Sequence, residues 1–273
     1  MSKKLPYRGF RWMTKEELSN WRDMPCILEV DLSYPEHLHD LHNDYPLAPE
    51  NVQVGKVSKL IPNLHNKERY TIHHENLKYY LEKGLVLTKI HRGITFEESN
   101  WMESYISLNT KLRAQATNDF EKEFFKLMNN AVYGKTLENV RNHVDVKLVT
   151  SKEEAKKWIC KPNFSRFTIY NKHFAAIHML KKKVVQNKPR YVGFTVLELS
   201  KLHMYNFHYN YIIPKYGDRA KLLFTDTDSL MYEIETDDFY KDIAPDVHDK
   251  FDTSNDPKDH PSGIETGVSK ETI

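Results

Sequence analysis

Hydrophobic and polar residues form strand-like patterns in several short stretches of this chain, and alternation with a period of two predicts a β-strand. The alternation is found at residues 85–91, and strand-like patterns also occur at residues 144–149 and 165–170 and in the apolar run at residues 26–30. Two further apolar runs, residues 221–224 and 230–234, stand on either side of a short acidic stretch. Their spacing predicts a β-hairpin with carboxylates near its turn.

A period of three to four residues predicts helices elsewhere. Residues 75–81 show this period and stop just before Gly84, and glycine readily adopts the left-handed conformation that ends a helix. Residues 95–98 read Thr-Phe-Glu-Glu, which has the form of a capping box, so we expect a helix over residues 98–116. Residues 152–159 and 191–211 also predict helices.

A second helix start follows closely, at Asn118 and Asp119. The apolar residues of this helix make one stripe, which comprises Phe120, Phe124, Leu127 and Ala131. The opposite face comprises Lys122, Lys126, Asn130 and Tyr133. Because the break between the two helices is short, we expect them to pack as an antiparallel hairpin.

Two other stretches carry weaker patterns. Tyr205, Phe207, Tyr209 and Tyr211 alternate in the manner of a strand, and packing beneath a sheet is favoured over base stacking for them. Beyond Thr236 the chain is acidic and rich in Pro, Asp and Ser, so we expect loops or partial disorder there.

Charge is nearly balanced over the 273 residues, with 40 Lys and Arg against 38 Asp and Glu, but it is unevenly distributed. Residues 111–201 hold 19 basic and 8 acidic residues, whereas residues 221–273 hold 5 and 14. A basic surplus suits a polyanionic partner, because Lys and Arg that neutralise phosphates release counterions. Solvated helix faces explain the basic surplus equally well.

The length of the chain allows one large domain or two interleaved ones.

Cysteine and histidine usage gives no sign of a metal or disulfide framework. Cys26 and Cys160 are the only cysteines, and neither belongs to a CxxC pair. The histidines include His37, His39, His42, His73 and His74, and their spacing matches no established zinc pattern. Surface or loop positions are therefore favoured for them.

The sequence contains no recognisable secretion signal or membrane-spanning segment. No signal peptide and no apolar run of about 18 residues is present, so we expect a soluble, intracellular protein, in the nucleus, an organelle or another compartment. The basic run at residues 181–183 fits a localisation signal or a contact with the DNA backbone as well as it fits a solvated helix end.

The acidic stretch between the last two apolar runs reads Asp-Thr-Asp-Ser. Two Asp at i and i+2 on a strand project to one face, so Asp226 and Asp228 can approach a single cation while Thr227 faces away. Mg²⁺ is usually held by one or two carboxylates together with substrate oxygens. Most such pairs are solvated turn residues, but the apolar strands on both sides favour a metal site here.

The second stretch of interest reads K-L-M-N-N-A-V-Y-G-K, at residues 126–135. Lys126, Asn130, Tyr133 and Gly134 fall on one helical face. A lysine there can meet a triphosphate, a tyrosine ring can stack below a sugar or base, and glycine lets another backbone approach closely. For any single residue, an amphipathic helix with a basic exposed side is the plainer interpretation.

Together these two stretches, about a hundred residues apart, resemble the two downstream signature motifs of the family B DNA polymerases, K-x-x-x-N-x-x-Y-G and D-T-D-S. Residues 108–113, 138–141 and 251–254 are similar to the divergent, protein-primed-like branch found in organelles, viruses, plasmids and Maverick-type mobile elements. The resemblance covers most of the chain.

The resemblance implies roles for individual residues. Asp228 would be the principal Mg²⁺ ligand and Asp226 a supporting carboxylate in a two-metal site near the primer terminus. Lys126 would contact the incoming triphosphate, and Tyr133 would help to exclude ribose. The other implied contacts to the nucleotide come from Asn130, Gly134, Lys122, Lys111 and Arg113.

The resemblance also implies the fold, which is an α+β palm, an antiparallel sheet with packed helices, joined to a helical-hairpin fingers subdomain. The expected segments are an N-terminal palm portion at residues 1–94, the fingers at 95–143, the palm with the D-T-D-S hairpin at 144–236, and an acidic tail at 237–273 that leads toward a thumb.

The family carries a third carboxylate in an upstream motif, D-x-x-S-L-Y-P or, in this branch, D-x-N-N-L-Y-G. Asp31 begins the similar stretch D-L-S-Y-P, but its tyrosine follows three residues later and not five. Residues 1–10 resemble the segment directly downstream of that motif in the family. We therefore expect a palm and fingers piece that begins just after the third carboxylate, without exonuclease or thumb, and a structural role for Asp31.

The leading hypothesis is a fragment of a DNA-directed DNA polymerase that replicates a mobile or viral-type element. It would join dNTPs to a 3′-hydroxyl with Mg²⁺ as cofactor and with template and primer DNA as partners. Whether a terminal protein or a nucleic acid supplies the primer stays open. The alternatives are a catalytically inactive nucleic-acid-binding relic without the first Asp, and an unrelated metal-dependent phosphatase or nuclease.

Overall fold

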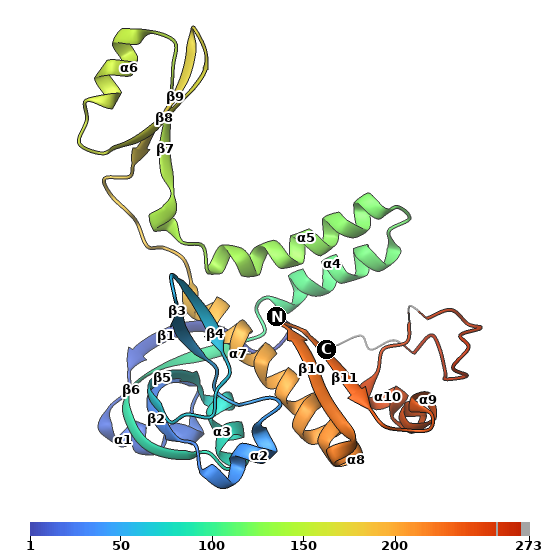
Figure 1. Ribbon diagram of the computed structural model, residues 1–273. Helices are drawn as coiled ribbons and strands as arrows, with labels where there is room; N and C mark the ends of the chain where they lie inside the picture. The colour runs from blue at the N-terminus through green and yellow to red at the C-terminus, as the bar shows by residue number, and fades with distance from the viewer. Residues whose placement is uncertain (255, 269–273) are drawn as a thin grey trace. The chain divides into compact units, whose positions relative to one another are not determined.

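The chain forms two compact units, and the computed structural model describes residues 1–254 and 256–268 (Figure 1). The first unit comprises Met1–Phe125 and Phe194–Ile273, and the second comprises Lys126–Gly193. Helices α5 (Asp119–Thr136) and α7 (Arg190–Phe207) each begin in one unit and end in the other. The boundaries between the two units differ from the boundaries of the four segments expected from the sequence.

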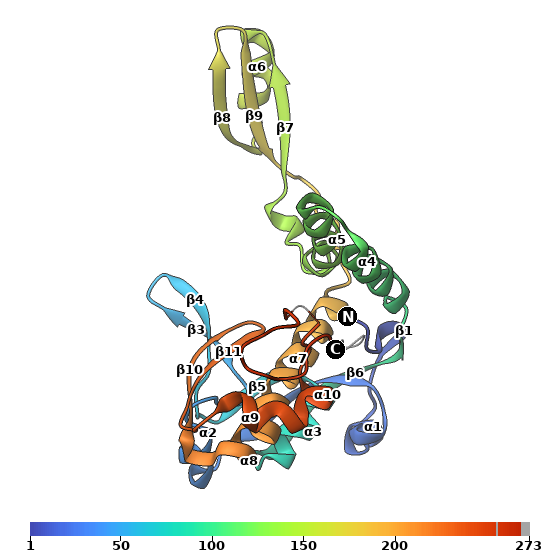
Figure 2. The same cartoon turned by 90° about the vertical axis from the view of Figure 1, so that its right-hand side faces the viewer.

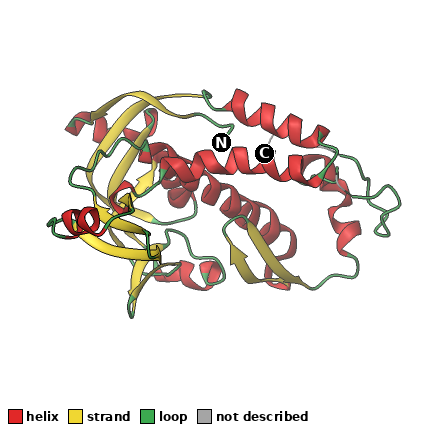
Figure 3. Cartoon of the chain, turned by 90° about the horizontal axis from the view of Figure 1, so that it is seen from above, coloured by secondary structure: helices red, strands yellow, loops and turns green. Residues whose placement is uncertain are grey.

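A four-stranded antiparallel sheet with the order β1-β6-β2-β5 forms the centre of the first unit. Its strands are β1 (Leu5–Trp12), β2 (Cys26–Ser33), β5 (Lys67–His73) and β6 (Val86–Ser99). Two separate hairpins pair β3 (Glu50–Val54) with β4 (Val57–Ile61), and β10 (Ala220–Asp226) with β11 (Ser229–Ile234). The helices wholly within this unit are α1 (Lys15–Ser19), α2 (His39–His42), α3 (His74–Glu82), α4 (Glu103–Gln115), α8 (Ile213–Tyr216), α9 (Phe239–Ile243) and α10 (Val247–Lys250). Antiparallel sheets with packed helices confirm the α+β class (Figure 3).

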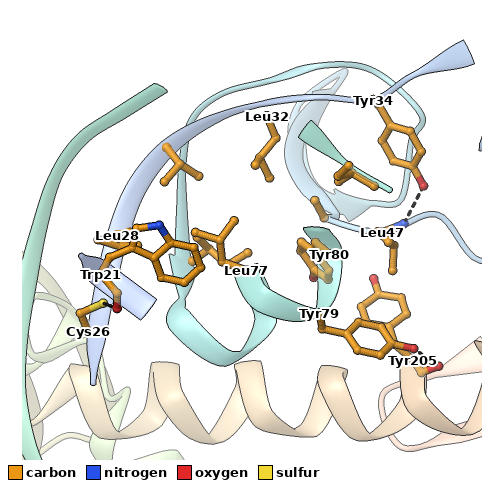
Figure 4. Close-up of a cluster of buried hydrophobic side chains, with 14 of the residues drawn as sticks. Trp21, Cys26, Leu28, Leu32, Tyr34, Leu47, Leu77, Tyr79, Tyr80 and Tyr205 are labelled. Carbon is orange, nitrogen blue, oxygen red and sulfur yellow. Dashed lines mark hydrogen bonds between the residues drawn. The ribbon is translucent and has the colours of Figure 1, made fainter. Parts of the chain in front are cut away.

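The core of the first unit lies between the sheet and helices α3 and α7 (Figure 4). Alternate residues of β2 are buried, because successive side chains of a strand point to opposite faces. The buried residues of β2 are Cys26, Leu28, Val30 and Leu32. Leu77 of α3 and Tyr205 of α7 close the core from the other side, since 0% and 2% of their surfaces are exposed.

Buried tyrosines tie α7 to its neighbours by hydrogen bonds. The hydroxyl of Tyr79 donates to the carbonyl oxygen of Tyr205 at 3.1 Å, and that of Tyr209 donates to the carbonyl oxygen of Tyr45 at 2.7 Å. The strand-like alternation after residue 204 produces no strand, because α7 continues into a π-helical turn over His208–Ile212. The packing role predicted for these aromatic residues is confirmed for Tyr205 and Tyr209.

Two buried histidines make the stability of the first unit depend on pH. His42 is hydrogen-bonded to the hydroxyl of Tyr34 at 2.8 Å, and His208 to that of Tyr232 at 2.9 Å. Burial lowers the pKa of each histidine to about 4. In the unfolded chain the pKa is about 6.5, so below that pH the unfolded state binds protons that the folded state excludes.

We therefore expect the free energy of unfolding to fall as pH is lowered from 7.5 to 5, by roughly 2 kcal/mol for each histidine. Urea unfolding at the two pH values measures this change. His208→Gln should reduce the pH dependence, whereas His37→Gln, at an exposed position, should leave it intact. A stability that is independent of pH over this range would contradict the assignment of two neutral buried rings.

The second unit is built on a three-stranded antiparallel sheet with the order β7-β9-β8 (Figure 2). Its strands are β7 (Val144–Val149), β8 (Phe164–Asn171) and β9 (Phe174–Leu180), and helix α6 (Lys152–Ile159) lies against one face. The hydroxyl of Ser151 caps α6 by accepting a hydrogen bond from the backbone N–H of Glu154 at 3.2 Å. Ile177 and Met179 of β9 are buried beneath this helix together with Val149.

The helix expected from residue 98 begins later, at Glu103, because β6 continues through the predicted capping box to Ser99. Thr95 pairs with Cys26 of β2, and its hydroxyl donates to the carbonyl oxygen of Pro25 at 2.9 Å. The side chain that was expected to cap a helix thus joins β6 to the residue before β2, and the prediction of a capping box is wrong.

Helix α5 begins where the sequence predicts, and Asn118 caps it by accepting from the backbone N–H of Glu121 at 2.9 Å. Only residues 116–118 separate it from α4, but the antiparallel packing of the two helices stays a prediction. The apolar stripe is exposed, with 79% of Phe120 and 62% of Leu127 accessible. Burial of this stripe within the chain is therefore not observed.

The acidic tail contains more structure than the sequence predicts. Asp238 caps α9 by accepting from the backbone N–H of Tyr240 at 3.1 Å, and α10 follows soon after. Its remaining described residues are mostly loop, as expected.

Candidate functional site

Asp226 and Asp228 lie at the tip of the β10–β11 hairpin. Asp226 ends β10 and pairs with Ser229, so residues 227 and 228 form a two-residue turn. Thr227 has a φ of +49°, the positive value that such tight turns require. The two carboxylates therefore flank the first residue of a turn and do not share one face of a strand, contrary to the prediction.

Hydroxyl groups hold the first of these carboxylates. Thr227 Oγ1 donates to Asp226 Oδ1 at 3.1 Å, and Ser229 Oγ donates to the backbone oxygen of Asp226 at 3.0 Å. Thr227 was expected to face away from the carboxylates, but its side chain contacts Asp226. Asp226 and Asp228 are both exposed, so their oxygen atoms are accessible to a cation and a substrate.

The hairpin is anchored at its base and exposed at its tip. Ala220 and Ile234 pack with the residues of α8 and the preceding π-helical turn, and the hydroxyl of Tyr232 meets His208. Toward the tip, 57% of Phe224 and 58% of Met231 are exposed. The base therefore fixes the hairpin, while its far end presents two carboxylates beside accessible apolar side chains.

The pair fits Mg²⁺, which binds oxygen ligands and usually takes one or two carboxylates together with water and phosphate oxygens. Asp226 and Asp228 supply carboxylate oxygens at an exposed position. Within residues 1–254 and 256–268, no third His, Cys, Asp or Glu joins them in a compact set of ligand atoms. Any further Mg²⁺ ligands would come from water, from a substrate or from groups other than the His, Cys, Asp and Glu side chains of these residues.

Asp31 does not extend this carboxylate pair, because its own contacts lie within the central sheet. Its Oδ1 accepts from the backbone N–H of Arg69 at 2.8 Å and lies 2.7 Å from Nε2 of His91. The N–H of Arg69 and the ring of His91 hold the pKa of Asp31 below its usual value. Arg69 has a φ of +50°, so Asp31 stabilises an unusual backbone conformation, in agreement with the structural role expected for it.

The residues of the K-x-x-x-N-x-x-Y-G stretch lie on α5, within the second unit. Lys126 and Asn130 are exposed, and Tyr133 is half-buried. Burial raises the pKa of the Tyr133 hydroxyl, which keeps it protonated at neutral pH. The helical conformation puts these side chains on the face predicted from their spacing.

Gly134 continues this face into the last turn of α5 and is exposed. A Cβ atom added there would meet nothing within 4 Å. Glycine inside a helix lowers the stability of the helix by roughly 0.5–1 kcal/mol relative to alanine. Because there is room for a side chain at residue 134, packing within the chain does not explain the glycine. Close approach of a partner is the reason that the sequence suggests.

Three further cations were expected to contact phosphates. Lys111 and Arg113 lie exposed on α4, and Lys122 lies exposed on the first part of α5. Lys122 Nζ is 4.0 Å from Asp119 Oδ1, one turn earlier, which is a weak surface ion pair. All three belong to the first unit, and their assigned roles stay predictions.

The histidines were predicted to lie at the surface or in loops, and this is wrong for four of them. The buried ones are His42, His73, His74 and His208, whereas His37 is exposed. Burial of His73 and His74 follows from their position at the β5–α3 junction, which single-residue composition does not reveal. Residues 181–183 lie exposed in the segment after β9 and do not end a helix.

The sequence profile described as DNA polymerase type B, organellar and viral, matches residues 1–214. The chain belongs to this family. The matched part includes the K-x-x-x-N-x-x-Y-G stretch of α5, and the D-T-D-S turn follows it after a short interval. Membership in this polymerase family overturns the alternative of an unrelated phosphatase or nuclease. No curated protein sequence matches the chain.

The fold is similar to that of a solved DNA polymerase. The phi29 DNA polymerase complexed with primer-template DNA and incoming nucleotide substrates has 14% sequence identity and a TM-score of 0.52, over 89% of this chain and 38% of that one. The phi29 polymerase binary complex with primer-template DNA gives 14% identity and a TM-score of 0.49, over 89% and 37%. The chain thus spans less than two fifths of the phi29 polymerase.

None of the helices in residues 1–254 and 256–268 is both long and apolar enough to cross a bilayer.

Proposed function

We propose that this chain carries the palm and fingers of a DNA-directed DNA polymerase that adds deoxynucleotides to a 3′-hydroxyl. The observation that carries the proposal is the D-T-D-S turn, which presents two exposed carboxylates at the tip of an anchored hairpin in a chain of the type B polymerase family. The proposed segments are those expected from the sequence, with palm at residues 1–94 and 144–236 and fingers at 95–143.

Asp228 and Asp226 are the residues that would hold Mg²⁺, with Asp228 as the principal ligand. The chemistry that Mg²⁺ supplies in such a site is neutralisation of phosphate charge and polarisation of the attacking hydroxyl. The hydroxyl of Thr227 fixes Oδ1 of Asp226, which limits the orientations of that carboxylate. In the overall reaction the 3′-oxygen bonds to the α-phosphorus of a dNTP and pyrophosphate leaves.

The face of α5 would bind the incoming nucleotide. Lys126 would pair with the triphosphate, Asn130 and Tyr133 would line the pocket, and Tyr133 would exclude ribose. The accessible surface at Gly134 leaves room for this ligand. Lys111, Arg113 and Lys122 would add phosphate contacts, and template and primer DNA would be the other partners, with a terminal protein as primer in the protein-primed mode.

Lys126→Ala should raise KM for dNTPs by about 10- to 100-fold with a smaller effect on kcat, because a hydrogen bond to a charged group contributes about 1.5–3 kcal/mol. Steady-state incorporation kinetics measure the effect. Lys157→Ala, an exposed lysine on α6, is the matched control and should leave KM unchanged. An unchanged KM in Lys126→Ala would remove Lys126 from the nucleotide site.

The experiment that tests the proposal is extension of a labelled primer on a DNA template, with dNTPs and Mg²⁺. We expect extension with Mg²⁺ and none after its removal by EDTA. Tight binding of primer-template DNA without extension would favour the inactive relic, and the absence of both binding and extension would contradict the proposal altogether.

A further inference from the structure

Three side chains with no part in the proposed polymerase site form a compact group in the first unit. His73 ends β5, His74 begins α3, and Glu98 lies near the end of β6. One ligand atom from each lies within 4.8 Å of the others, and no other such group of three occurs in residues 1–254 and 256–268. Because the ligands come from three elements, their spacing in the sequence matches no zinc motif.

The ring of His73 has an unsatisfied atom that faces this group. Only 1% of His73 is exposed, and its Nε2 is buried without a hydrogen-bond partner among the described residues. Nε2 lies 3.7 Å from Oε1 of Glu98, which is too long for a hydrogen bond. It is close to the separation of about 3.4 Å between two ligands that each lie 2.0–2.1 Å from a tetrahedral zinc ion.

His74 is oriented in the way that metal-binding histidines are. Its Nδ1 lies 3.2 Å from the carbonyl oxygen of Cys26 and accepts from the backbone N–H of the same residue at 3.3 Å in the other tautomer. With the proton on Nδ1, the ring donates to the carbonyl oxygen, gives up the bond from the N–H, and leaves Nε2 available to a metal. Nε2 lies 3.1 Å from Oε1 of Glu75, a second carboxylate beside the group, and this oxygen also accepts from Nζ of Lys78 at 2.9 Å.

We propose that His73, His74 and Glu98 bind a Zn²⁺ ion, with Glu75 as an additional oxygen donor. Two imidazoles and carboxylate oxygens are a zinc donor set, whereas Mg²⁺ prefers oxygen ligands alone. Binding through Nε2 of His73 requires the proton on Nδ1, so the long 3.4 Å hydrogen bond that Nδ1 accepts from the N–H of Glu75 is given up. The ion joins the β5–α3 junction to the end of β6, separately from the carboxylates of the D-T-D-S turn.

The test is a calorimetric titration of the chelator-treated full chain with ZnCl₂. We expect one ion per chain. His74→Gln and Glu98→Gln should each weaken binding by at least about 100-fold, since loss of even an outer-shell partner of a metal ligand costs 10- to 100-fold. His37→Gln, at an exposed histidine, and Asp226→Asn with Asp228→Asn should leave the affinity unchanged.

Thermal unfolding gives a second measurement that does not depend on polymerase activity. Saturating Zn²⁺ should raise the Tm of the wild-type chain and of His37→Gln, but not that of Glu98→Gln, whose shape is nearly that of the native residue. Absence of one-to-one binding to the wild-type chain, or equal affinity in wild type, His74→Gln and Glu98→Gln, would overturn the proposal whether or not the chain extends primers.

Discussion

Asp228→Asn is expected to lower the rate of nucleotide incorporation by about 10³-fold, the largest effect on activity of any single substitution considered. Removal of the negative charge weakens the binding of Mg²⁺. The bound ion contributes several kcal/mol by stabilising the charge of the transition state, and each 1.36 kcal/mol changes the rate tenfold. Single-turnover incorporation with primer-template DNA measures the rate. The exposed turn position means that the variant should fold normally.

Asp237→Asn is the matched control, because it removes an exposed carboxylate a short distance along the chain and outside the hairpin. Its incorporation rate should equal that of the wild-type chain. Primer-template binding should persist in both variants, since the substitution alters the metal ligand and not the basic surfaces. Equal rates in Asp228→Asn and wild type would remove Asp228 from the reaction.

Leu28→Ala is expected to lower the free energy of unfolding by about 2–5 kcal/mol, the largest effect on stability. Leu28 is fully buried in β2, within the core that α3 and α7 close (Figure 4). Truncation removes buried apolar surface and leaves a cavity that the sheet cannot easily fill. Urea unfolding at pH 7.5 measures the loss.

Leu41→Ala provides the comparison, because 57% of Leu41 is exposed and the same atoms are removed there from a solvated position. Its free energy of unfolding should stay within about 0.5 kcal/mol of the wild-type value. Similar losses in the two variants would mean that Leu28 does not lie in a tightly packed core.

Several elements were predictable because their local signals agree with their tertiary surroundings. The strand at residues 144–149 and the helix at 152–159 are found at those bounds, and Ser151 caps the start of the helix. The hairpin around the D-T-D-S turn is also found, since two apolar runs separated by a short acidic stretch leave few other pairings.

Other elements depend on partners that are distant in the sequence. Residues 95–98 have a local preference for a helix start, but pairing of β6 with β1 on one side and β2 on the other keeps them extended. β9 reads Phe-Ala-Ala-Ile-His-Met-Leu without clear alternation, so its position between β7 and β8 depends on pairing with residues that its own pattern does not indicate. The sequence did not predict strands β1, β3 and β4, because their residues show no clear apolar pattern.

The candidate site was predictable in its residue types but not in its geometry. A spacing of two implies one strand face, and the structure instead turns the chain at Thr227, where a positive φ places the two carboxylates around the turn. Likewise, the composition of the histidines indicates surface positions, but the β5–α3 junction buries His73 and His74. In both cases the deciding factor is backbone geometry, which residue spacing alone does not encode.

The most direct test of the account is single-nucleotide incorporation by the wild-type chain opposite each of the four template bases, with Mg²⁺ and all four dNTPs supplied one at a time. A template-directed polymerase adds the complementary nucleotide in each case and releases pyrophosphate. We predict this pattern for the wild-type chain and its loss in Asp228→Asn. Incorporation that ignores the template base, or that persists equally in Asp228→Asn, would contradict the account.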